Sequence, residues 1–315
     1  MSKGTEAGEV TNMTPLAVTI SKGLGGSRTV AVNEIKSVQF ADEPTELSQA
    51  RLNVANGAYA NAVTALSKID AKDLKRDFIK QDFEFYQAIC AARLALGGSG
   101  EITDAGRQLN TFVRTYPNNF HYLAACEAMG DLLMAADKYE FAERQYAELD
   151  KTPWPDHKMR ASVAIGRSLQ AQGKHDDAIE QFDAALAMAT DAPDAQNQKL
   201  SATLGKAISL AQTGSVEQAV GTIEKVIQDA DPEEKELHAR AYNALGSCYE
   251  KGGQKKDALL AFLHVDIVYA SVPNAHAEAL AHLATLWQAV GQEQRAREAR
   301  QTLKDRYGSS KWAKQ

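Results

Sequence analysis

The sequence contains little that would support a membrane, secreted or disulfide-bonded protein. Among its 315 residues there is no run of about 18 apolar residues, the length that a transmembrane helix needs. Met1–Gly4 lacks the apolar core of a signal peptide. The three cysteines, Cys90, Cys126 and Cys248, lie far apart in apolar helical stretches, which is typical of small buried side chains. As given, the chain is expected to be soluble and untargeted.

Motifs for catalysis and for nucleic-acid binding are also missing. There is no glycine-rich turn followed by lysine and Ser/Thr, no Gly-x-Ser-x-Gly, no His-Glu-x-x-His and no Cys-x-x-Cys. The seven histidines never stand three or four residues apart, so no helical turn presents a metal-binding pair. A net charge of -6 argues against a phosphate-backbone partner. We therefore expect no enzymatic activity, no cofactor, no metal and no nucleic acid.

An internal repeat is what the sequence does contain. Seven alanines recur at spacings of 36 to 43 residues, at positions Ala62, Ala105, Ala142, Ala178, Ala219, Ala258 and Ala296. Twelve residues before six of them stands a small residue: Ala50, Gly130, Gly166, Ala207, Gly246 or Ala284. Seven residues after each of these stands Gly57, Asp137, Gly173, Gly214, Gly253 or Gly291. Five of these six positions are glycine. Because glycine makes up about 7% of an average protein, such a match would arise by chance roughly once in 10⁵ trials.

Each repeat unit predicts a pair of antiparallel helices, here called helix A and helix B. The small residue allows helix A to approach helix B closely, and the glycine ends helix A and turns the chain. Beyond the alanine, residues such as Phe182 and Ala185 continue the i, i+4, i+7 core stripe of helix B. The last unit has Arg300 in this stripe, as expected for a terminal helix that faces water. In the second unit, Leu96–Glu101 is interpreted as an extended loop.

These positions resemble the tetratricopeptide repeat family, whose pattern is a small residue, then alanine, an aromatic residue, alanine and a helix-ending proline. The resemblance covers roughly residues 45–315. The best matches are Gly166, Gly173, Ala178, Phe182 and Ala185 in one unit, and Gly246, Tyr249, Gly253, Ala258 and Phe262 in another. It implies a mainly α-helical, right-handed superhelix of about seven helix pairs over residues 43–315.

Residues 1–42 have a different pattern, with period-two alternation and glycine turns. We predict four strands, at Glu9–Thr11, Leu16–Ser21, Arg28–Val32 and Ser37–Phe40. Their order resembles a small SH3-like or Sm-like barrel, and a plain antiparallel meander is the equal alternative. Because so few residues bury little surface, this β module is expected to dock on the first repeat or to mediate self-association.

The family resemblance also implies where a ligand would bind. Helix A lines a concave groove, with ligand positions six and three residues before, and one and four after, the first small residue. The candidate peptide-binding residues are Glu127, Asp131, Arg160, Arg167, Gln170, Arg240 and Asn243. Only Asn243 resembles a position of the carboxylate clamp in chaperone-type members. The three arginines either hold an acidic or extended peptide or are solubilising charges paired across the groove.

The resulting hypothesis is a non-enzymatic scaffold or adaptor that binds a peptide or protein segment in its groove. The alternative is a small-ligand sensor, or an accessory subunit of an enzyme or of an envelope-assembly complex. Residues 262–312 resemble envelope-assembly repeat proteins through Val268-Tyr269, the spacing to Trp287 and the segment Lys304–Ser310, which favours a bacterial protein. Two locations stay open: the periplasm, after removal of a leader, or the cytoplasm. The identity of the partner is not predicted.

Overall fold

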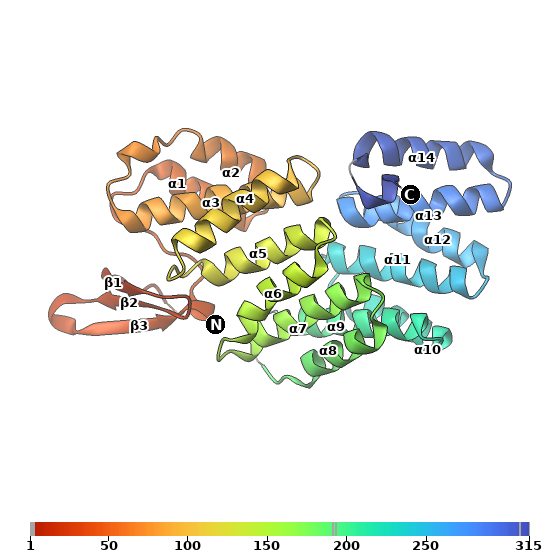
Figure 1. The fold of residues 1–315 in the computed structure, drawn as a ribbon, viewed down its shortest axis with the longest axis horizontal. Helices are drawn as coiled ribbons and strands as arrows, with labels where there is room; N and C mark the ends of the chain where they lie inside the picture. Colours follow the sequence, from red (N-terminus) through yellow and green to blue (C-terminus); the bar gives the residue numbers. More distant parts are fainter. Residues whose placement is uncertain (1–3, 191, 193, 309, 315) are drawn as a thin grey trace. The chain divides into compact units, whose positions relative to one another are not determined.

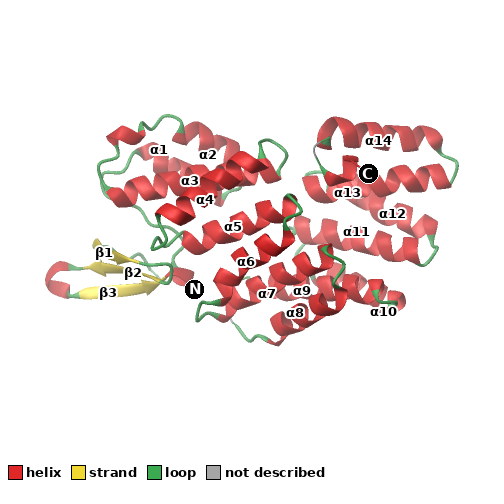
Figure 2. Ribbon diagram, viewed as in Figure 1, coloured by secondary structure: helices red, strands yellow, loops and turns green. Residues whose placement is uncertain are grey.

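A computed structural model describes residues 4–190, 192, 194–308 and 310–314 of the chain. Over these residues, three strands near the N-terminus are followed by fourteen α-helices (Figures 1 and 2). This confirms the predicted class, a helical-repeat solenoid preceded by a small antiparallel sheet. The chain forms two compact units, Met1–Trp154 and Pro155–Gln315, and each is described by itself below. The predicted domains, 1–42 and 43–315, concern independent folding and stay a prediction.

The β module is an open three-stranded meander. Strands β1 (Glu9–Met13), β2 (Ala17–Ser21) and β3 (Ser27–Ala31) pair antiparallel in the order β1-β2-β3. Val10 lies opposite Ile20, and a bulge follows between Val10 and Asn12. Val18 and Ile20 point to the same face of β2 and are buried, as alternation along a strand requires.

The fourth predicted strand, Ser37–Phe40, is wrong. Phe40 is buried and stacks on Phe78, with 6.4 Å between ring centroids, and its backbone N–H donates to Glu43 Oε2 at 2.9 Å. Val32, Ile35 and Val38 pack partly buried against the core that contains Val18, Ile20 and Phe40. The apolar residues of this segment therefore pack into the core of the first unit and do not extend the sheet.

The first unit contains three helix pairs. The A helices are α1 (Thr45–Ala55), α3 (Asp77–Leu96) and α5 (Tyr122–Ala135), and the B helices are α2 (Tyr59–Leu66), α4 (Ile102–Thr115) and α6 (Tyr139–Asp150). Each A helix packs on its own B helix, and α3 also contacts α1 and α5. One hydrophobic core connects the sheet, the segment around Phe40 and helices α1 to α5.

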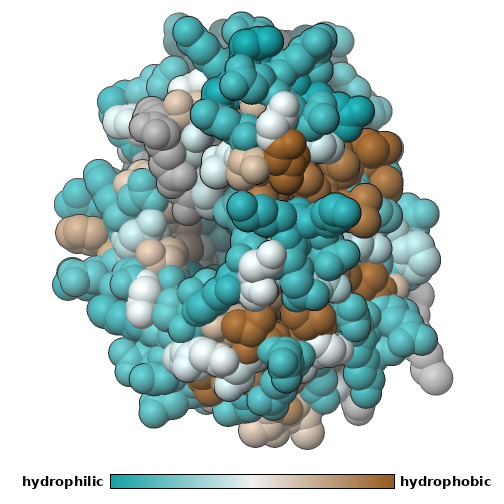
Figure 3. Space-filling model, turned by 90° about the vertical axis from the view of Figure 1, so that its right-hand side faces the viewer, coloured by the Kyte–Doolittle hydropathy of each residue, from teal (hydrophilic) through white to brown (hydrophobic). Residues whose placement is uncertain are grey.

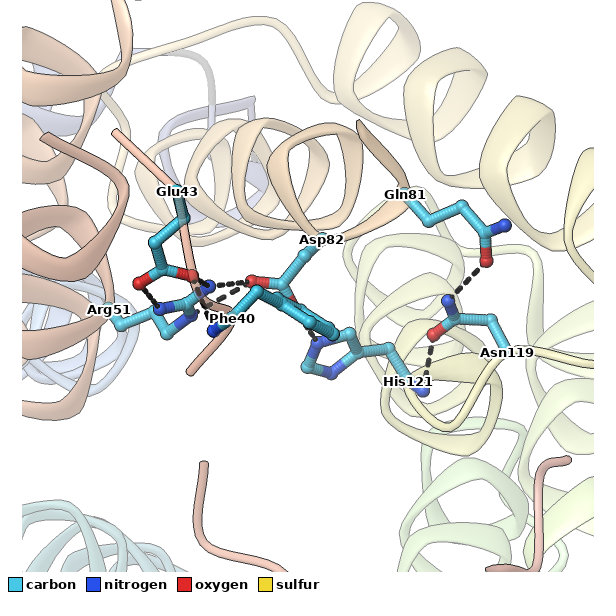
Figure 4. A network of polar contacts seen from close by, with 7 residues as sticks. All are labelled: Phe40, Glu43, Arg51, Gln81, Asp82, Asn119 and His121. Atoms are coloured by element: carbon cyan, nitrogen blue, oxygen red, sulfur yellow. Dashed lines mark hydrogen bonds and ion pairs between the residues drawn. The ribbon is translucent and has the colours of Figure 1, made fainter. Parts of the chain in front are cut away.

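A buried polar network lies beside that core (Figure 4). The Arg51 guanidinium of α1 donates to both Glu43 oxygens, at 2.5 and 2.6 Å, and to Asp82 Oδ2 of α3 at 2.6 and 2.8 Å. Asp82 Oδ1 lies 2.8 Å from His121 Nε2, and the His121 ring stacks on Phe85. Because every charge has a partner of opposite sign or a hydrogen bond, the network can be buried.

The second unit contains four helix pairs. The A helices are α7 (Pro155–Ala171), α9 (Ala195–Gln212), α11 (Lys235–Lys251) and α13 (Pro273–Ala289). The B helices are α8 (His175–Ala187), α10 (Val216–Asp229), α12 (Lys255–Val268) and α14 (Glu293–Tyr307). A short 3-10 helix, Lys311–Lys314, packs on α13 and α14. None of the helices in the described part of the chain combines the length and apolar content that a membrane-spanning helix needs.

The turn between helix A and helix B explains the glycine repeat. The residue predicted to end helix A has a left-handed backbone conformation, with φ between 55° and 114°, at Gly57, Asp137, Gly173, Gly214, Gly253 and Gly291. Glycine adopts this region without steric cost, and aspartate tolerates it. The second pair uses Gly98, with φ 83°, in the predicted extended loop. The repeat therefore follows from a backbone requirement.

The small residue of helix A receives the aromatic ring of helix B. A Cβ atom placed on Gly166 would lie 2.7 Å from the Phe182 ring, and one on Gly246 would lie 2.7 Å from the Phe262 ring. Both rings are fully buried. The close approach predicted from these positions is confirmed, and any side chain larger than hydrogen would displace the ring.

Candidate functional site

In the second unit, the A helices lie next to one another, since α9 contacts both α7 and α11, and α11 contacts α13. Two of the predicted groove residues connect these helices. Gln170 Nε2 of α7 donates to Gly205 O and Ser209 Oγ of α9, at 2.7 and 2.9 Å. Asn243 of α11 is buried, and its Nδ2 donates to Ala275 O of α13 at 2.9 Å. Both amides therefore hold adjacent A helices together.

Lys251, at the end of α11, forms hydrogen bonds with the C-terminus of α9. Its ammonium group donates to the carbonyl oxygens of Ala211 and Gln212 at 2.8 and 3.0 Å. These carbonyls belong to the last turn of α9, where backbone acceptors have no partner within the helix and a cation is favoured. The charge of Lys251 is thus used by the fold.

A pocket of about 220 Å³ lies on the A-helix face between α9, α11 and α13. Its walls combine small and apolar side chains with basic and polar ones. They are formed by Ile208, Ala211, Gln212, Arg240, Ala244, Ser247, Cys248, Lys251 and Glu278. Three consecutive helix pairs therefore contribute to a single hollow, which we call the A-face pocket.

Arg240 is the predicted site residue that lines this pocket. Its side chain is half-buried, and no hydrogen bond or ion pair within 4.0 Å joins it to any residue that the structure describes. Burial lowers the pKa of its guanidinium, and the positive charge of Arg167 lowers it further, against the longer-range effects of Glu236 and Glu278. The pocket thus exposes a cation that lacks a close counter-ion.

The other two arginines are placed differently. Arg167 Nη2 lies 3.8 Å from Glu236 Oε1, with 40% of the Arg167 side chain exposed. Arg160 lines a separate hollow of about 260 Å³, whose other residues are Asp156, Met159, Ala192, Asp194, Ala195 and Gln198. The structure does not bring the three arginines into one pocket.

The two predicted residues of the first unit lie on α5. Asp131 accepts hydrogen bonds from Arg93 of α3 and Tyr146 of α6, both at 3.0 Å. Glu127 is half-buried and also has a partner. Asp131 therefore connects three helices of its unit, in the same manner as Gln170 and Asn243 in the second unit.

Among the pocket residues with charged or amide side chains, sequence reasoning missed Gln212, Lys251 and Glu278. Glu278 stands six residues before Ala284, so the position rule used for the middle units would have found it in the last unit. Gln212 and Lys251 each stand five residues after the small residue of their helix, one position beyond the rule. They reach the pocket because it extends to the ends of α9 and α11.

A second surface feature lies on α12, a B helix. Leu260, Ile267 and Val268 are 66%, 75% and 53% exposed, and their spacing of seven and eight residues places them on one side of the helix. Figure 3 shows that hydrophobic side chains also gather in separate patches on the face that it presents, between larger hydrophilic areas. The α12 residues are not part of the A-face pocket.

Comparison with known proteins gives a match within the second unit of the chain. Residues 163–235 and 204–266 match a family model described as tetratricopeptide repeat. No curated protein sequence matches the chain. These residues include the helices that supply most of the A-face pocket.

Three solved structures with a similar fold are all distant in sequence. A tetratricopeptide repeat protein from Parabacteroides merdae is 15% identical, with a TM-score of 0.57 over 84% of this chain and 92% of that one. The apo form of RapI is 12% identical, with a TM-score of 0.64 over 84% and 98%. NprR in complex with its cognate peptide NprX is 14% identical, with a TM-score of 0.55 over 85% and 79%. At these identities the likeness shows the fold alone.

Proposed function

We propose that this tetratricopeptide repeat protein is a non-enzymatic scaffold that binds a peptide or protein segment on its A-helix face. The observation that carries the proposal is the A-face pocket, to which three successive helix pairs contribute side chains. An extended segment that crosses several A helices would contact such a surface along its length. The peptide complex of NprR is an example of a protein with this fold that binds a peptide.

The size of the pocket favours a protein segment over a small metabolite. Its volume of about 220 Å³ is below the roughly 300 Å³ at which pockets for small molecules begin. A hollow of this size suits one side chain of a longer ligand. We therefore prefer the scaffold to a small-ligand sensor.

The seven predicted residues have different roles in this proposal. Arg240 of α11 faces the segment directly, and Arg160 and Arg167 add basic character on α7. Gln170 and Asn243 keep the A helices at the spacing that the segment requires. Glu127 and Asp131 stand at the corresponding sequence positions of α5, an A helix of the first unit.

Partner capture from native cells with crosslinking tests the proposal. Replacing Arg160, Arg167 and Arg240 together with glutamate should abolish capture while helical circular dichroism is retained, because none of the three arginines is fully buried. The control reverses two exposed charges on B helices, Glu180 of α8 and Lys225 of α10, and should leave capture intact.

A second variant separates the groove from the sheet. Deletion of residues 1–42 removes the sheet and Phe40 from the core of the first unit and should lower the stability of that unit. Most of the helical signal and partner capture should be retained, because each repeat is stabilised mainly by its neighbours. Normal capture by the folded triple variant, together with loss of capture on deletion of 1–42, would show that the β module is the recognition element.

A further inference from the structure

We propose that the A-face pocket binds a single carboxylate of the partner segment through Arg240, beside a small apolar group; this inference rests on the proposed scaffold function. The group is either an Asp or Glu side chain or the C-terminal carboxylate of the segment.

The fold uses the other cations near the pocket. Lys251 donates to two carbonyl oxygens at the end of α9 and to Gln212 Oε1. Arg167 lies within ion-pair distance of Glu236. Arg240 has neither kind of contact with the described residues, although it lines the pocket. A guanidinium that has lost part of its hydration without a partner is costly, and a bound carboxylate would remove that cost by accepting two parallel hydrogen bonds.

The rest of the lining restricts what can bind. Ile208, Ala211 and Ala244 form an apolar wall, and Ser247 supplies a hydroxyl group. Glu278, on the α13 side, accepts a hydrogen bond from Asn243 at 3.2 Å and brings a negative charge to the pocket. One carboxylate is balanced by Arg240, whereas a phosphate group with nearly two negative charges would be repelled by Glu278. The pocket therefore favours a singly charged acid with little bulk around it.

Selection from random peptides tests the inference. Three heptapeptide libraries are presented to the immobilised full-length protein: one with free carboxyl termini, one amidated, and one amidated and lacking Asp and Glu. We expect enrichment from the first library alone if the ligand is a C-terminus, or from the first and second if it is a side chain. The third library should give none. Equal enrichment from the third library would overturn the carboxylate site while leaving the scaffold function standing.

Binding of the selected peptides to variants then identifies Arg240. Arg240→Gln should weaken their affinity by about 10- to 100-fold, the effect of losing a charged hydrogen-bonded contact. The matched control is Arg297→Gln on α14, an exposed arginine near Glu293, which should bind as the wild type does. Unchanged affinity of Arg240→Gln would overturn the inference. If no peptide is enriched from any library, the scaffold proposal itself fails.

Two further measurements separate ligand binding from structural support. Because Arg240 lacks a close counter-ion, Arg240→Gln should have a melting temperature equal to or above that of the wild type. A lower melting temperature accompanying the weaker binding would assign Arg240 a structural role and overturn the inference. Replacing the selected acidic residue by phosphoserine should weaken binding, and tighter binding would contradict the preference for a single charge.

Discussion

Two arginines on A helices, one in each unit, have opposite surroundings. Arg51 of α1 is 6% exposed and is held by the carboxylates of Glu43 and Asp82 from the same chain. Arg240 of α11 is also removed from bulk water in part, but no described carboxylate lies within ion-pair distance of it. Burial disfavours both charges, and in Arg51 the two carboxylates outweigh it and raise the pKa, whereas in Arg240 the pKa falls.

The difference shows how one residue type can serve the fold or a ligand. A buried guanidinium with its partners supplied by the chain holds distant segments in place, while one without them is a cost that a ligand can remove. Stability given up at a binding site is a common consequence of function. We expect four effects, of which the loss of the Arg51 contacts is the largest.

The largest expected effect is the loss of Arg51. Arg51→Gln should reduce the free energy of unfolding by about 3–5 kcal/mol, because Glu43 and Asp82 would be left buried with an unpaired charge. Urea unfolding followed by circular dichroism measures the change. In the same assay Arg240→Gln should be neutral or stabilising. Similar destabilisation by the two substitutions would remove the distinction between them.

A smaller effect is expected from filling the contact between helix A and helix B. Gly166→Leu should cost about 1–3 kcal/mol through overpacking, since a Cβ atom there already lies 2.7 Å from the Phe182 ring. Gly221→Leu on α10 is the matched control, because nothing lies within 4 Å of a Cβ atom at that position. It should be neutral or slightly stabilising, as glycine disfavours a helix interior. An unchanged urea midpoint for Gly166→Leu would contradict the assigned repeat register.

The smallest effect concerns pH and the network around Arg51. Burial lowers the pKa of His121 from 6.5, against the opposing influence of Asp82. The unfolded chain therefore takes up a proton below about pH 6.5 that the folded chain resists, so stability is full above that pH and falls as the pH falls. One site contributes up to about 1.4 kcal/mol per pH unit. Urea unfolding at pH 7.5 and 5.5 should show a smaller loss in His121→Gln than in the wild type, and equal losses would contradict the assignment.

A further decrease is expected at lower pH. Burial alone would raise the pKa of Glu43, but hydrogen bonds from Arg51, Ser48 and the Phe40 backbone outweigh it and lower the pKa. The stability that Glu43 contributes is therefore present above its unfolded pKa of about 4.3 and is lost as the pH falls below it. The two steps titrate in separate windows, so unfolding measured between pH 7.5 and 3 distinguishes them.

The repeat was predictable because its signal is local. Gly173 must adopt a left-handed backbone, and Gly166 must admit the Phe182 ring, so each position restricts the amino acid directly. The second helix pair does not follow the spacing rule of the other units. Its turn residue Gly98 precedes Ala105 by seven residues, whereas Gly173 precedes Ala178 by five. The strand predicted at Ser37–Phe40 failed for the opposite reason. The partners that decide its conformation, such as Phe78, are distant in the sequence.

For the candidate site, sequence spacing predicted which side of helix A carries polar residues but not what they contact. Gln170 and Arg240 come from the same rule, yet Gln170 is occupied by Gly205 and Ser209 of the neighbouring helix while Arg240 faces a pocket. Such a distinction depends on groups that lie 35 and 39 residues away in the chain. Spacing within one repeat carries no information about it.

The network around Asp82 also has a consequence for how the first unit opens. Repeat proteins usually unfold according to nearest-neighbour interfaces, so that terminal repeats can fray separately. Asp82 of α3, however, binds Arg51 of α1 through one oxygen and His121, at the start of α5, through the other. If any one of these helices opened, a charged side chain on a remaining helix would lose its partner while it is still buried beside the apolar core. Such an unpaired buried charge is costly. The first three helix pairs are thus coupled into one cooperative unit, whose backbone amides should exchange their hydrogens together.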